Sequence, residues 1–413
     1  MAETDSQIMP RLGLLSTPQS GSGFPPRMQG QTSKELPFYK VGSLSIVGED
    51  GTIDDSRNTI SVEQAHELKA SIIPSGSILL AKIGAALLLG RFVQTKFDCC
   101  IDNNMLALIP QKGVDPKYLY YATCLIDVTN LENPGPVPTL DIKGLTQVRI
   151  PLPPLPTERA IADYLDRETA EIDGMRADLD EMERLLEERR VSIIQRHVLP
   201  ENGTYTRIKL VADVSLGKTV QKTQKDSSEV LRNYVRAAHI QPHGRLILDD
   251  QPMWFTSNEL KQLTLEAGDV LVVEGGAGYG RSVYLREGLP GWGFQNHVIR
   301  VRPLAGASGR FIDYTIRAHY GAGLIDILAD GATIPGLSSD KARELPILNV
   351  SYAEQRRIAD EIDRETAEID SMLEDITKLR DLLAERRAAV ISAAVTGQID
   401  IPASLDDKDE PHA

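Results

Sequence analysis

Side chains suited to chemistry lie in short polar loops of this chain, and the most conspicuous loop is rich in glycine. Residues 275–281 follow an apolar strand candidate and superficially resemble a dinucleotide-binding fingerprint. No helical pattern and no ribose-binding acid follow in a βαβ unit, which disfavours a nucleotide site. Two interpretations stay open: a plain hairpin turn, or a loop whose backbone N–H groups and Arg281 side chain approach a nucleic-acid phosphate.

Catalytic and metal-binding patterns are missing from the sequence. An adenine methyltransferase needs an Asn/Asp-Pro-Pro-aromatic loop, and the nearest segment, residues 133–135, has glycine at its third position. The seven histidines have no ligand spacing, and no Gly-x-Ser-x-Gly elbow occurs. Cys99, Cys100 and Cys124 form neither a disulfide framework nor a metal-ligand set. We therefore predict no catalytic residue, no metal and no cofactor in this chain.

Amide and cationic side chains remain as candidates for binding a nucleic acid. Asn and Gln can pair bidentately with adenine, and Lys and Arg neutralise phosphates. A turn at a strand entrance explains the amides equally well, and a solvated lysine explains each cation equally well. The candidates are Lys40, Lys82, Arg91, Lys96, Asn103, Asn104, Lys218, Lys222, Lys225, Tyr279, Arg281, Gln295, Asn296 and His297.

A repeated helical segment organises the rest of the chain. The octet 166–173 recurs letter for letter as 363–370, an offset of 197 positions that flanking residues share on both sides. Apolar residues in both copies follow a two-seam heptad pattern, typical of a coiled coil, whereas unrelated amphipathic helices would not reproduce an octet. The predicted seam residues are Ile161, Leu165, Ile172, Met175, Leu179, Met182 and Leu186 in the first copy and Ile358, Ile362, Ile369, Met372, Ile376, Leu379 and Leu383 in the second.

Helix signals bound the two copies. The first helix is predicted to start at Thr157, after a proline run, and to stop before Pro200. Ser351 and Glu354 have capping-box spacing at the start of the second helix, which is predicted to end near Gly397. About 42 residues at 1.5 Å each give a rod roughly 60 Å long.

Charge is divided unevenly between these helices and the rest of the chain. The chain has 413 residues and a net charge of −14, of which residues 151–199 carry −5 and residues 351–413 carry −8. Residues 1–150 and 200–350 are near neutral, so acidity of the whole chain does not exclude a nucleic-acid partner for them. We expect a cytoplasmic protein, because the sequence shows neither an apolar membrane span nor the cationic and apolar regions of a signal peptide.

The segments between the helices repeat an order of short strands, turns and small helices. Residues 37–41, 78–81 and 105–109 have counterparts at 234–236, 270–274 and 298–301. The predicted fold is α+β, with two globular α/β domains joined by two long helices in an antiparallel coiled coil. We call residues 1–150 head one, 151–199 arm one, 200–350 head two and 351–399 arm two, followed by an acidic tail at 400–413. The strand predicted at 206–210 in head two has no clear counterpart ahead of Gly21.

This arrangement resembles the specificity subunit of type I restriction–modification systems over nearly the whole chain. The resemblance rests on residues 37–42, on the proline-rich stretch 150–159, on Leu345-Pro346 with Glu354-Gln355, and on both helix copies. It implies two target-recognition domains that each bind one half of a bipartite site in double-stranded DNA. It also implies that the helices dock two modification (methyltransferase) subunits, which restriction subunits can join in phage defence. S-adenosylmethionine, ATP and Mg are then expected on partner subunits.

Two heads on one rod would recognise a split, non-palindromic site whose halves lie on the order of 18 base pairs apart. An alternative function is a coiled-coil scaffold whose globular ends bind proteins, which basic side chains clustered on one face of each head would disfavour. A self-sufficient restriction–modification enzyme is disfavoured by the missing catalytic motifs.

Overall fold

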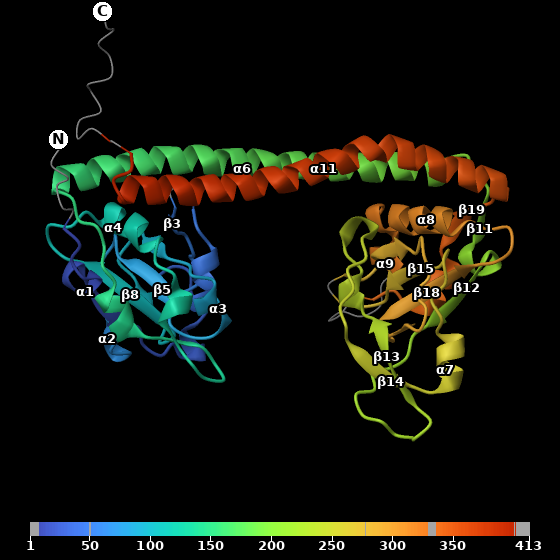
Figure 1. Ribbon diagram of the computed structural model, residues 1–413, viewed down its shortest axis with the longest axis horizontal. Coiled ribbons are helices and arrows are strands. Elements are labelled where there is room, and N and C mark those ends of the chain that lie inside the picture. Colours follow the sequence, from blue (N-terminus) through green and yellow to red (C-terminus); the bar gives the residue numbers. More distant parts are fainter. Residues whose placement is uncertain (1–7, 49–50, 277, 329–335, 400, 402–413) are drawn as a thin grey trace, which may run out of the picture. The chain divides into compact units, whose positions relative to one another are not determined.

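The chain folds into two compact units, each made of one head and part of both long helices (Figure 1). The computed structural model describes residues 8–48, 51–276, 278–328, 336–399 and 401. One unit comprises Met1–Asp180 and Lys378–Ala413, and the other comprises Glu181–Thr377. Each unit is therefore built around a head and completed by helical segments about 200 residues apart in sequence. The predicted acidic tail lies outside the described residues except for Ile401.

Head one contains two small sheets surrounded by short helices. The five-stranded sheet has the order β1-β8-β5-β6-β3, the three-stranded sheet has the order β4-β2-β7, and β9 and β10 form a separate ladder. In chain order the elements are α1 (Leu12–Leu15), β1 (Ser16–Ser20), η1 (Pro26–Met28), β2 (Leu36–Tyr39), η2 (Val41–Ser45), β3 (Thr52–Ile53), β4 (Thr59–Ile60), α2 (Val62–Glu67), β5 (Ile78–Ala81), α3 (Ala85–Leu88), β6 (Val93–Thr95), β7 (Cys100–Ile101), β8 (Met105–Pro110), α4 (Pro116–Thr123), η3 (Val128–Leu131), β9 (Glu132–Asn133), β10 (Thr139–Leu140) and α5 (Ile142–Gln147).

Head two has the same plan with a longer helix against its arm. A four-stranded sheet runs β12-β18-β15-β16, a three-stranded sheet runs β14-β13-β17, and β11 pairs with β19. The elements are β11 (Tyr205–Arg207), η4 (Ile208–Leu210), β12 (Ala212–Leu216), β13 (Val230–Val235), η5 (Ala237–His239), η6 (Pro242–Gly244), β14 (Pro252–Phe255), α7 (Ser257–Gln262), β15 (Val270–Val273), β16 (Ser282–Tyr284), β17 (Gly293–Phe294), β18 (Val298–Pro303), α8 (Gly309–Gly321), α9 (Leu324–Leu328), α10 (Ser339–Glu344) and β19 (Pro346–Leu348).

The start of head one contains counterparts of the elements that open head two, although the sequence showed no clear one ahead of Gly21. β1 pairs antiparallel with β8 as β12 pairs with β18 in head two. Ahead of β1, Leu12 N donates to Val148 O, and the equivalent Ile208 N donates to Leu345 O. The counterpart of β11 is the isolated bridge between Arg11 and Arg149. This counterpart could not be predicted from the sequence, because a single bridge leaves no alternating strand pattern.

The arms are the helices α6 (Leu155–Val198) and α11 (Tyr352–Val395), 44 residues each. α6 starts two residues before the predicted Thr157, since proline is tolerated in the first helical turn. α11 starts after Ser351, whose hydroxyl accepts from Glu354 N, and Gly397 follows its end with a φ of 72°.

Within each unit the two arm helices run antiparallel. In the unit of head one, Arg387 lies 3.6 Å from Asp173, and Arg380 pairs with Asp180. In the unit of head two, Arg190 lies 2.9 Å from Asp370. The pairs Asp173–Arg387 and Arg190–Asp370 exchange into each other under the 197-residue offset, so the repeat builds the same helix contact twice.

Burial differs among the predicted seam residues. The buried ones are Ile161, Leu165, Ile172, Ile358, Ile362, Ile369 and Ile376. Met175, Leu179, Leu186 and Leu383 are half-buried. The interpretation fails at Met182, Met372 and Leu379, which are 50%, 42% and 47% exposed. A strict heptad drifts around a 3.6-residue helix, so apolar positions of one seam can turn toward solvent while Ile376 of the other seam stays buried.

Each head shares its core with the arm helices of its own unit. The core of head one includes Leu165 of α6 together with Ile391 and Val395 of α11. The core of head two includes Ile194 and Val198 of α6 with Ile362 of α11. Burying each such aliphatic side chain contributes about 1.5–3 kcal/mol, so a head and its arm segments form one cooperative unit.

Candidate nucleic-acid interface

In head one, a tight turn before β8 brings several candidate residues together. Residues 102–105 are closed by a hydrogen bond from Met105 N to Asp102 O (3.0 Å), and Asp102 N donates to Tyr39 O (3.0 Å). Lys82 follows β5, and its backbone N–H donates to Asn104 O (2.8 Å). Because Ala81 lies opposite Met105, Lys82 lies opposite Asn104 at the end of the sheet.

Head two contains the same turn with the same bonds but different side chains. Val298 N donates to Gln295 O (2.9 Å), and Gln295 N donates to Val235 O (3.0 Å). Glu274 follows β15, and its backbone N–H donates to His297 O (3.0 Å). We call each turn with its strand-end residue a polar platform: residues 82 and 102–104 in head one, and residues 274 and 295–297 in head two.

A glycine packs against each platform. A Cβ on Gly21 would lie 2.1 Å from Asp102 O, and one on Gly217 would lie 2.3 Å from Gln295 O. The backbone of Ser22 then bridges to Asp102, and that of Lys218 bridges to Gln295. Both glycines are needed because no side chain fits between the two backbones.

The side chains of the head one platform are polar and accessible. Lys82 Nζ lies 3.2 Å from Ser20 Oγ, and Asn103 is exposed. Burial raises the pKa of Asp102, whereas Lys40 and Lys82 act to lower it. Lys40 also donates to Gln29 Oε1 (2.9 Å). Lys40 and Lys82 therefore act on one carboxylate, which also accepts from Asn104 N (2.7 Å), and Asn103 lies in the same turn.

Other candidate cations of head one lie elsewhere. Arg91 and Lys96 are exposed and flank β6, which is paired between β5 and β3. Their assignment as phosphate contacts stays a prediction.

In head two the platform is electrostatically different. Glu274 Oε2 lies 3.7 Å from His297 Nδ1, and the His297 side chain is 58% exposed. Burial raises the pKa of Glu274, and His297 opposes that shift. Gln295 and Asn296 are half-buried beside them. The sequence did not single out Glu274, and only its alignment with Lys82 could have done so.

The glycine-rich loop is a hairpin connection. It joins the antiparallel strands β15 and β16, Val273 N donates to Arg281 O (2.9 Å), and Tyr279 OH donates to Asp326 of α9. A strand rather than a helix follows the loop, so the dinucleotide fingerprint is excluded. The phosphate-binding role of Tyr279 and Arg281 stays a prediction.

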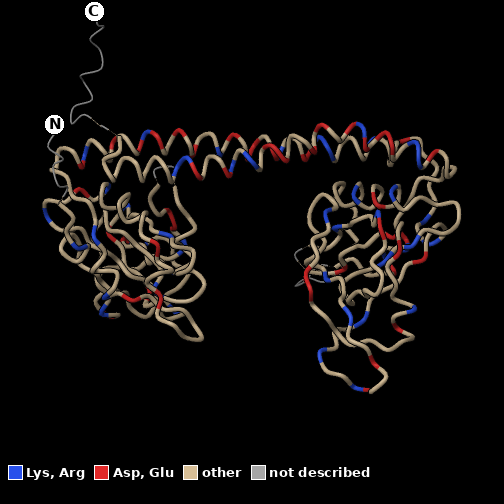
Figure 2. The backbone as a smooth tube through the Cα atoms, in the orientation of Figure 1, with Lys and Arg blue, Asp and Glu red and all other residues tan. Residues whose placement is uncertain are grey.

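The basic loop of head two forms a small polar cavity. A pocket of about 430 Å³ is lined by residues 218–223 with Lys225 and Glu259. Lys218 Nζ is paired with Glu259 Oε2 (2.6 Å), and its side chain is only 12% exposed. Lys222 and Lys225 are exposed on the same loop, which projects from the end of head two away from the arm helices (Figure 2). Lys222 and Lys225 are therefore better placed than Lys218 to meet a phosphate.

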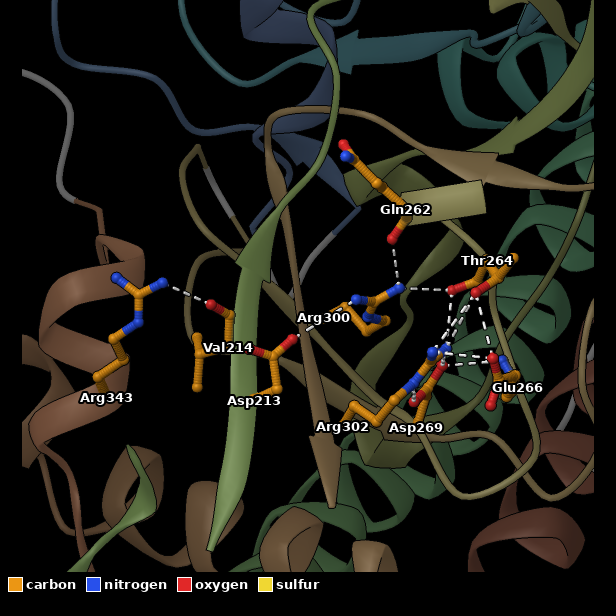
Figure 3. A network of polar contacts seen from close by, with 9 residues as sticks. All are labelled: Asp213, Val214, Gln262, Thr264, Glu266, Asp269, Arg300, Arg302 and Arg343. Carbon is orange, nitrogen blue, oxygen red and sulfur yellow. Dashed lines mark hydrogen bonds and ion pairs between the residues drawn. The ribbon is translucent and has the colours of Figure 1, made fainter. Parts of the chain in front are cut away.

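An ionic network fixes the strand that follows the head two platform (Figure 3). Arg300, on β18, donates to the carbonyls of Gln262 (2.9 Å) and Thr264 (2.7 Å). Arg302, two residues on, donates to both oxygens of buried Asp269 at 2.7 Å. Burial lowers the pKa of Arg300, whereas the bonds to Asp269 raise that of Arg302.

The same strand position in head one is apolar. Arg300 lies opposite Leu271, as Ala107 lies opposite Leu79. The two heads thus keep one backbone framework under different side-chain packing.

Sequence reasoning missed the joint that attaches each head to its arms. Tyr121 of α4 donates its hydroxyl to Asp166 (2.6 Å), and Lys117 Nζ lies 2.8 Å from the same carboxylate. In head two, Tyr314 and Arg310 of α8 contact Asp363. The repeated octet was the available signal, since its first residue is this aspartate.

A second repeated contact caps the helix at each joint. The Glu158 carboxylate accepts from Asp115 N (2.7 Å), and the Gln355 side-chain oxygen accepts from Ser308 N (2.9 Å). Asp115 and Ser308 are the N-caps of α4 and α8. The arms therefore recognise the same backbone feature of both heads.

Metal and membrane signatures are not found among the described residues. No group of three or more His, Cys, Asp or Glu side chains within them has the proximity to hold a metal ion. No helix in the described part of the chain is long and apolar enough to span a bilayer.

The fold and the paired platforms define a class of protein in which two α/β domains are each attached by the same joint to a pair of long antiparallel helices. Comparisons with known proteins agree. Residues 28–184 match the model of the type I restriction modification DNA specificity domain. The type I restriction enzyme StySPI specificity subunit of Salmonella potsdam is 21% identical over 393 residues, covering 88% of this chain and 82% of that protein.

Solved structures match along the whole chain. One is a chain from work on the structural basis of complex assembly and conformational transition of the type I R-M system. It has a TM-score of 0.67 and 15% identity, and the match covers 97% of this chain and 100% of that chain. The HsdS subunit of Thermoanaerobacter tengcongensis has a TM-score of 0.44 and 16% identity, covering 96% and 98%. The first match confirms the predicted α+β fold.

The resemblance to type I restriction–modification specificity subunits is thereby confirmed, and residues 28–184 carry the DNA specificity domain of that family.

Proposed function

We propose that this chain is the non-catalytic DNA-recognition subunit of a type I restriction–modification complex, in which each head binds one half of a bipartite site. The observation that carries the proposal is the pair of polar platforms. Their backbone bonds are repeated in both heads, while their side chains differ at equivalent positions. A constant framework with variable polar side chains suits two different half-sites, because base edges are distinguished by donors and acceptors.

The arms set the spacing between the half-sites in this proposal. Each 44-residue helix extends about 66 Å, or roughly 19 base pairs of B-DNA. A fixed separation of two DNA-binding modules selects a fixed separation of half-sites. The predicted spacer therefore depends on the helix length and is common to any pair of heads carried by these arms.

The arms also dock two modification subunits. Exposed apolar side chains occur in equivalent pairs, Met182 with Leu379 and Leu185 with Leu382, each about half exposed. Such residues on an otherwise charged helix mark a surface for protein binding. Two equivalent sets support two copies of one partner. S-adenosylmethionine, ATP and Mg act on the partners, and the assembly methylates cytoplasmic DNA and takes part in phage defence.

The test is methylome sequencing of cells that express this chain with the neighbouring methyltransferase gene. A new bipartite N6-methyladenine motif that disappears when this chain is omitted is the expected result. A soluble complex of the two proteins that methylates no new motif would contradict the proposal. That outcome would favour the scaffold function, in which the heads bind proteins.

A further inference from the structure

The equivalence of the two polar platforms extends to the direction of their side chains. On β5, Ile78 and Leu80 face the core shared with the arms, and Leu79 and Ala81 face the opposite core. Lys82 continues this alternation on the arm-facing side. On β15, Val270 and Val272 face the equivalent core of head two, so Glu274 leaves its sheet on the same side.

The residue opposite each of these positions shares that face. Asn104 precedes Met105 and His297 precedes Val298, and both neighbours face the other core. Lys82 with Asn104, and Glu274 with His297, are therefore directly opposed cross-strand pairs at one corner of each sheet.

The chemistry of the two pairs is opposite. Lys82 only donates hydrogen bonds, whereas a Glu274 carboxylate only accepts them. Asn104 is an amide that can do both, and His297 presents an exposed ring beside the Glu274 carboxylate (3.7 Å). Lysine matches the O6 and N7 acceptors of guanine, and glutamate matches the N4 amino donor of cytosine.

We propose that the pairs Lys82–Asn104 and Glu274–His297 are specificity-determining and contact base edges of the two half-sites. This rests on the proposed function and deepens it. In this proposal Lys82 contacts a base, whereas the sequence suggested that it contacts a phosphate. The reversed polarity gives the two halves different bases at equivalent positions, with the strand-end residue of head one selecting an acceptor edge and that of head two a donor edge.

Three features favour base contact over a purely structural role. Neither pair belongs to the joint with the arms, where Asp166 and Asp363 accept the tyrosine hydroxyls. The Lys82 amine has a neutral hydroxyl rather than a carboxylate within hydrogen-bond distance. The backbone beneath both pairs is held by the same three hydrogen bonds, so the side chains can change without moving the turn.

The experiment exchanges the pairs in the full chain co-expressed with its methyltransferase. Variant one carries Lys82→Glu with Asn104→His, and variant two carries Glu274→Lys with His297→Asn. Single variants Lys82→Gln and Glu274→Gln alter polarity with little change of size. Lys112→Glu in head one and Glu287→Lys in head two, both exposed, are matched charge controls.

Each variant is scored by methylome sequencing and by selection of bound duplexes from a randomised pool. Each exchange is expected to alter one or two adjacent positions in its own half-site. The other half and the spacer stay unchanged, and the relative preference for the affected bases shifts roughly 5- to 150-fold. The controls keep the original motif. The duplex selection reports preference even where a variant no longer supports methylation.

Two results overturn the inference while leaving the proposed function intact. One is an unchanged motif in all four exchange and single variants. The other is a uniform gain or loss of affinity across all sequences, which identifies the pairs as phosphate contacts. If the unaltered chain directs no bipartite motif, the proposed function itself fails, and that control separates the two failures.

Discussion

The joint between Tyr121 and Asp166 is expected to hold head one on its arms with a measurable coupling energy. The Tyr121 side chain is buried, and its hydroxyl lies 2.6 Å from the Asp166 carboxylate. A hydrogen bond to a charged acceptor contributes about 1.5–3 kcal/mol. The Asp166 side chain is 36% exposed, so solvent screening reduces this value to about 1–2 kcal/mol.

A double-mutant cycle isolates that coupling. Tyr121→Phe, Asp166→Ala and the double variant are compared with the unaltered chain, and Asp163→Ala, an exposed position one turn earlier on α6, is the matched control. Two units do not unfold as one two-state system. The free energy of local opening is therefore measured by hydrogen exchange of the α4 amides, with calorimetry of the whole chain as a second reading.

The repeat gives this experiment an internal replicate. Tyr314→Phe with Asp363→Ala is expected to give a coupling of similar size, seen at α8 and not at α4. A coupling below about 0.5 kcal/mol at both joints would refute the role assigned to the aspartate. A large effect at one joint alone would refute the claim that the identical octet reflects identical attachment.

Other perturbations test the stability of each head and the length of the arms. Arg57 lowers the pKa of Asp55 from 3.8 to about 2, so Asp55 stabilises head one above pH 3.8 and this contribution is lost as the pH falls through about 2. Asp55→Asn should lower the free energy of unfolding by about 1–2 kcal/mol at neutral pH, a value reduced by screening because Arg57 is exposed to solvent, and by little at pH 2. An equal loss at both pH values would contradict this. Asp269→Ala removes both hydrogen bonds from the Arg302 guanidinium to Asp269 but leaves its ion pair with Glu266 (2.8 Å). It should lower the free energy of unfolding of head two by about 1.5–3 kcal/mol, and a loss under about 1 kcal/mol would show that solvent and Glu266 replace the contact. Seven residues inserted within 174–182 lengthen one helix by about 10 Å and should change the spacer or abolish assembly, so an unchanged spacer would contradict the spacing role.

The arms were predictable from sequence because their order is local. Heptad periodicity, the proline run and the Ser351 cap define helices whose ends the structure places within about two residues of prediction. The exposure of Met182 and Leu379 was not predictable from the heptad pattern, since Ile376, on the neighbouring seam of the same central region, is buried. Periodicity reports the side of a helix that is apolar, and it does not report whether another element covers that side.

The candidate site was predictable in its residues and not in its geometry. Asn103 and Asn104 stood out as amides beside a strand, but their opposition to Lys82 depends on pairing of β5 with β8 across more than 20 residues. Lys218 looked like a free cation because Glu259, 41 residues later, cannot be placed beside it from sequence. Long-range strand pairing and ion pairs of this kind require the fold.

The contacts of the joints and of the arm helices explain where the two halves of the chain are identical in sequence and where they differ. Asp166 and Asp363 must each accept a tyrosine hydroxyl and a cation, and Asp173 and Asp370 must each meet an arginine of the opposite helix. A substitution of any of these four aspartates would remove a contact that the other unit also makes. At the polar platforms the backbone makes the repeated bonds, so side chains are free to differ without cost to the fold. Exact repetition of the octet and divergence at the platforms is therefore the pattern expected of two heads that are attached to the helices in the same way and bind different sequences.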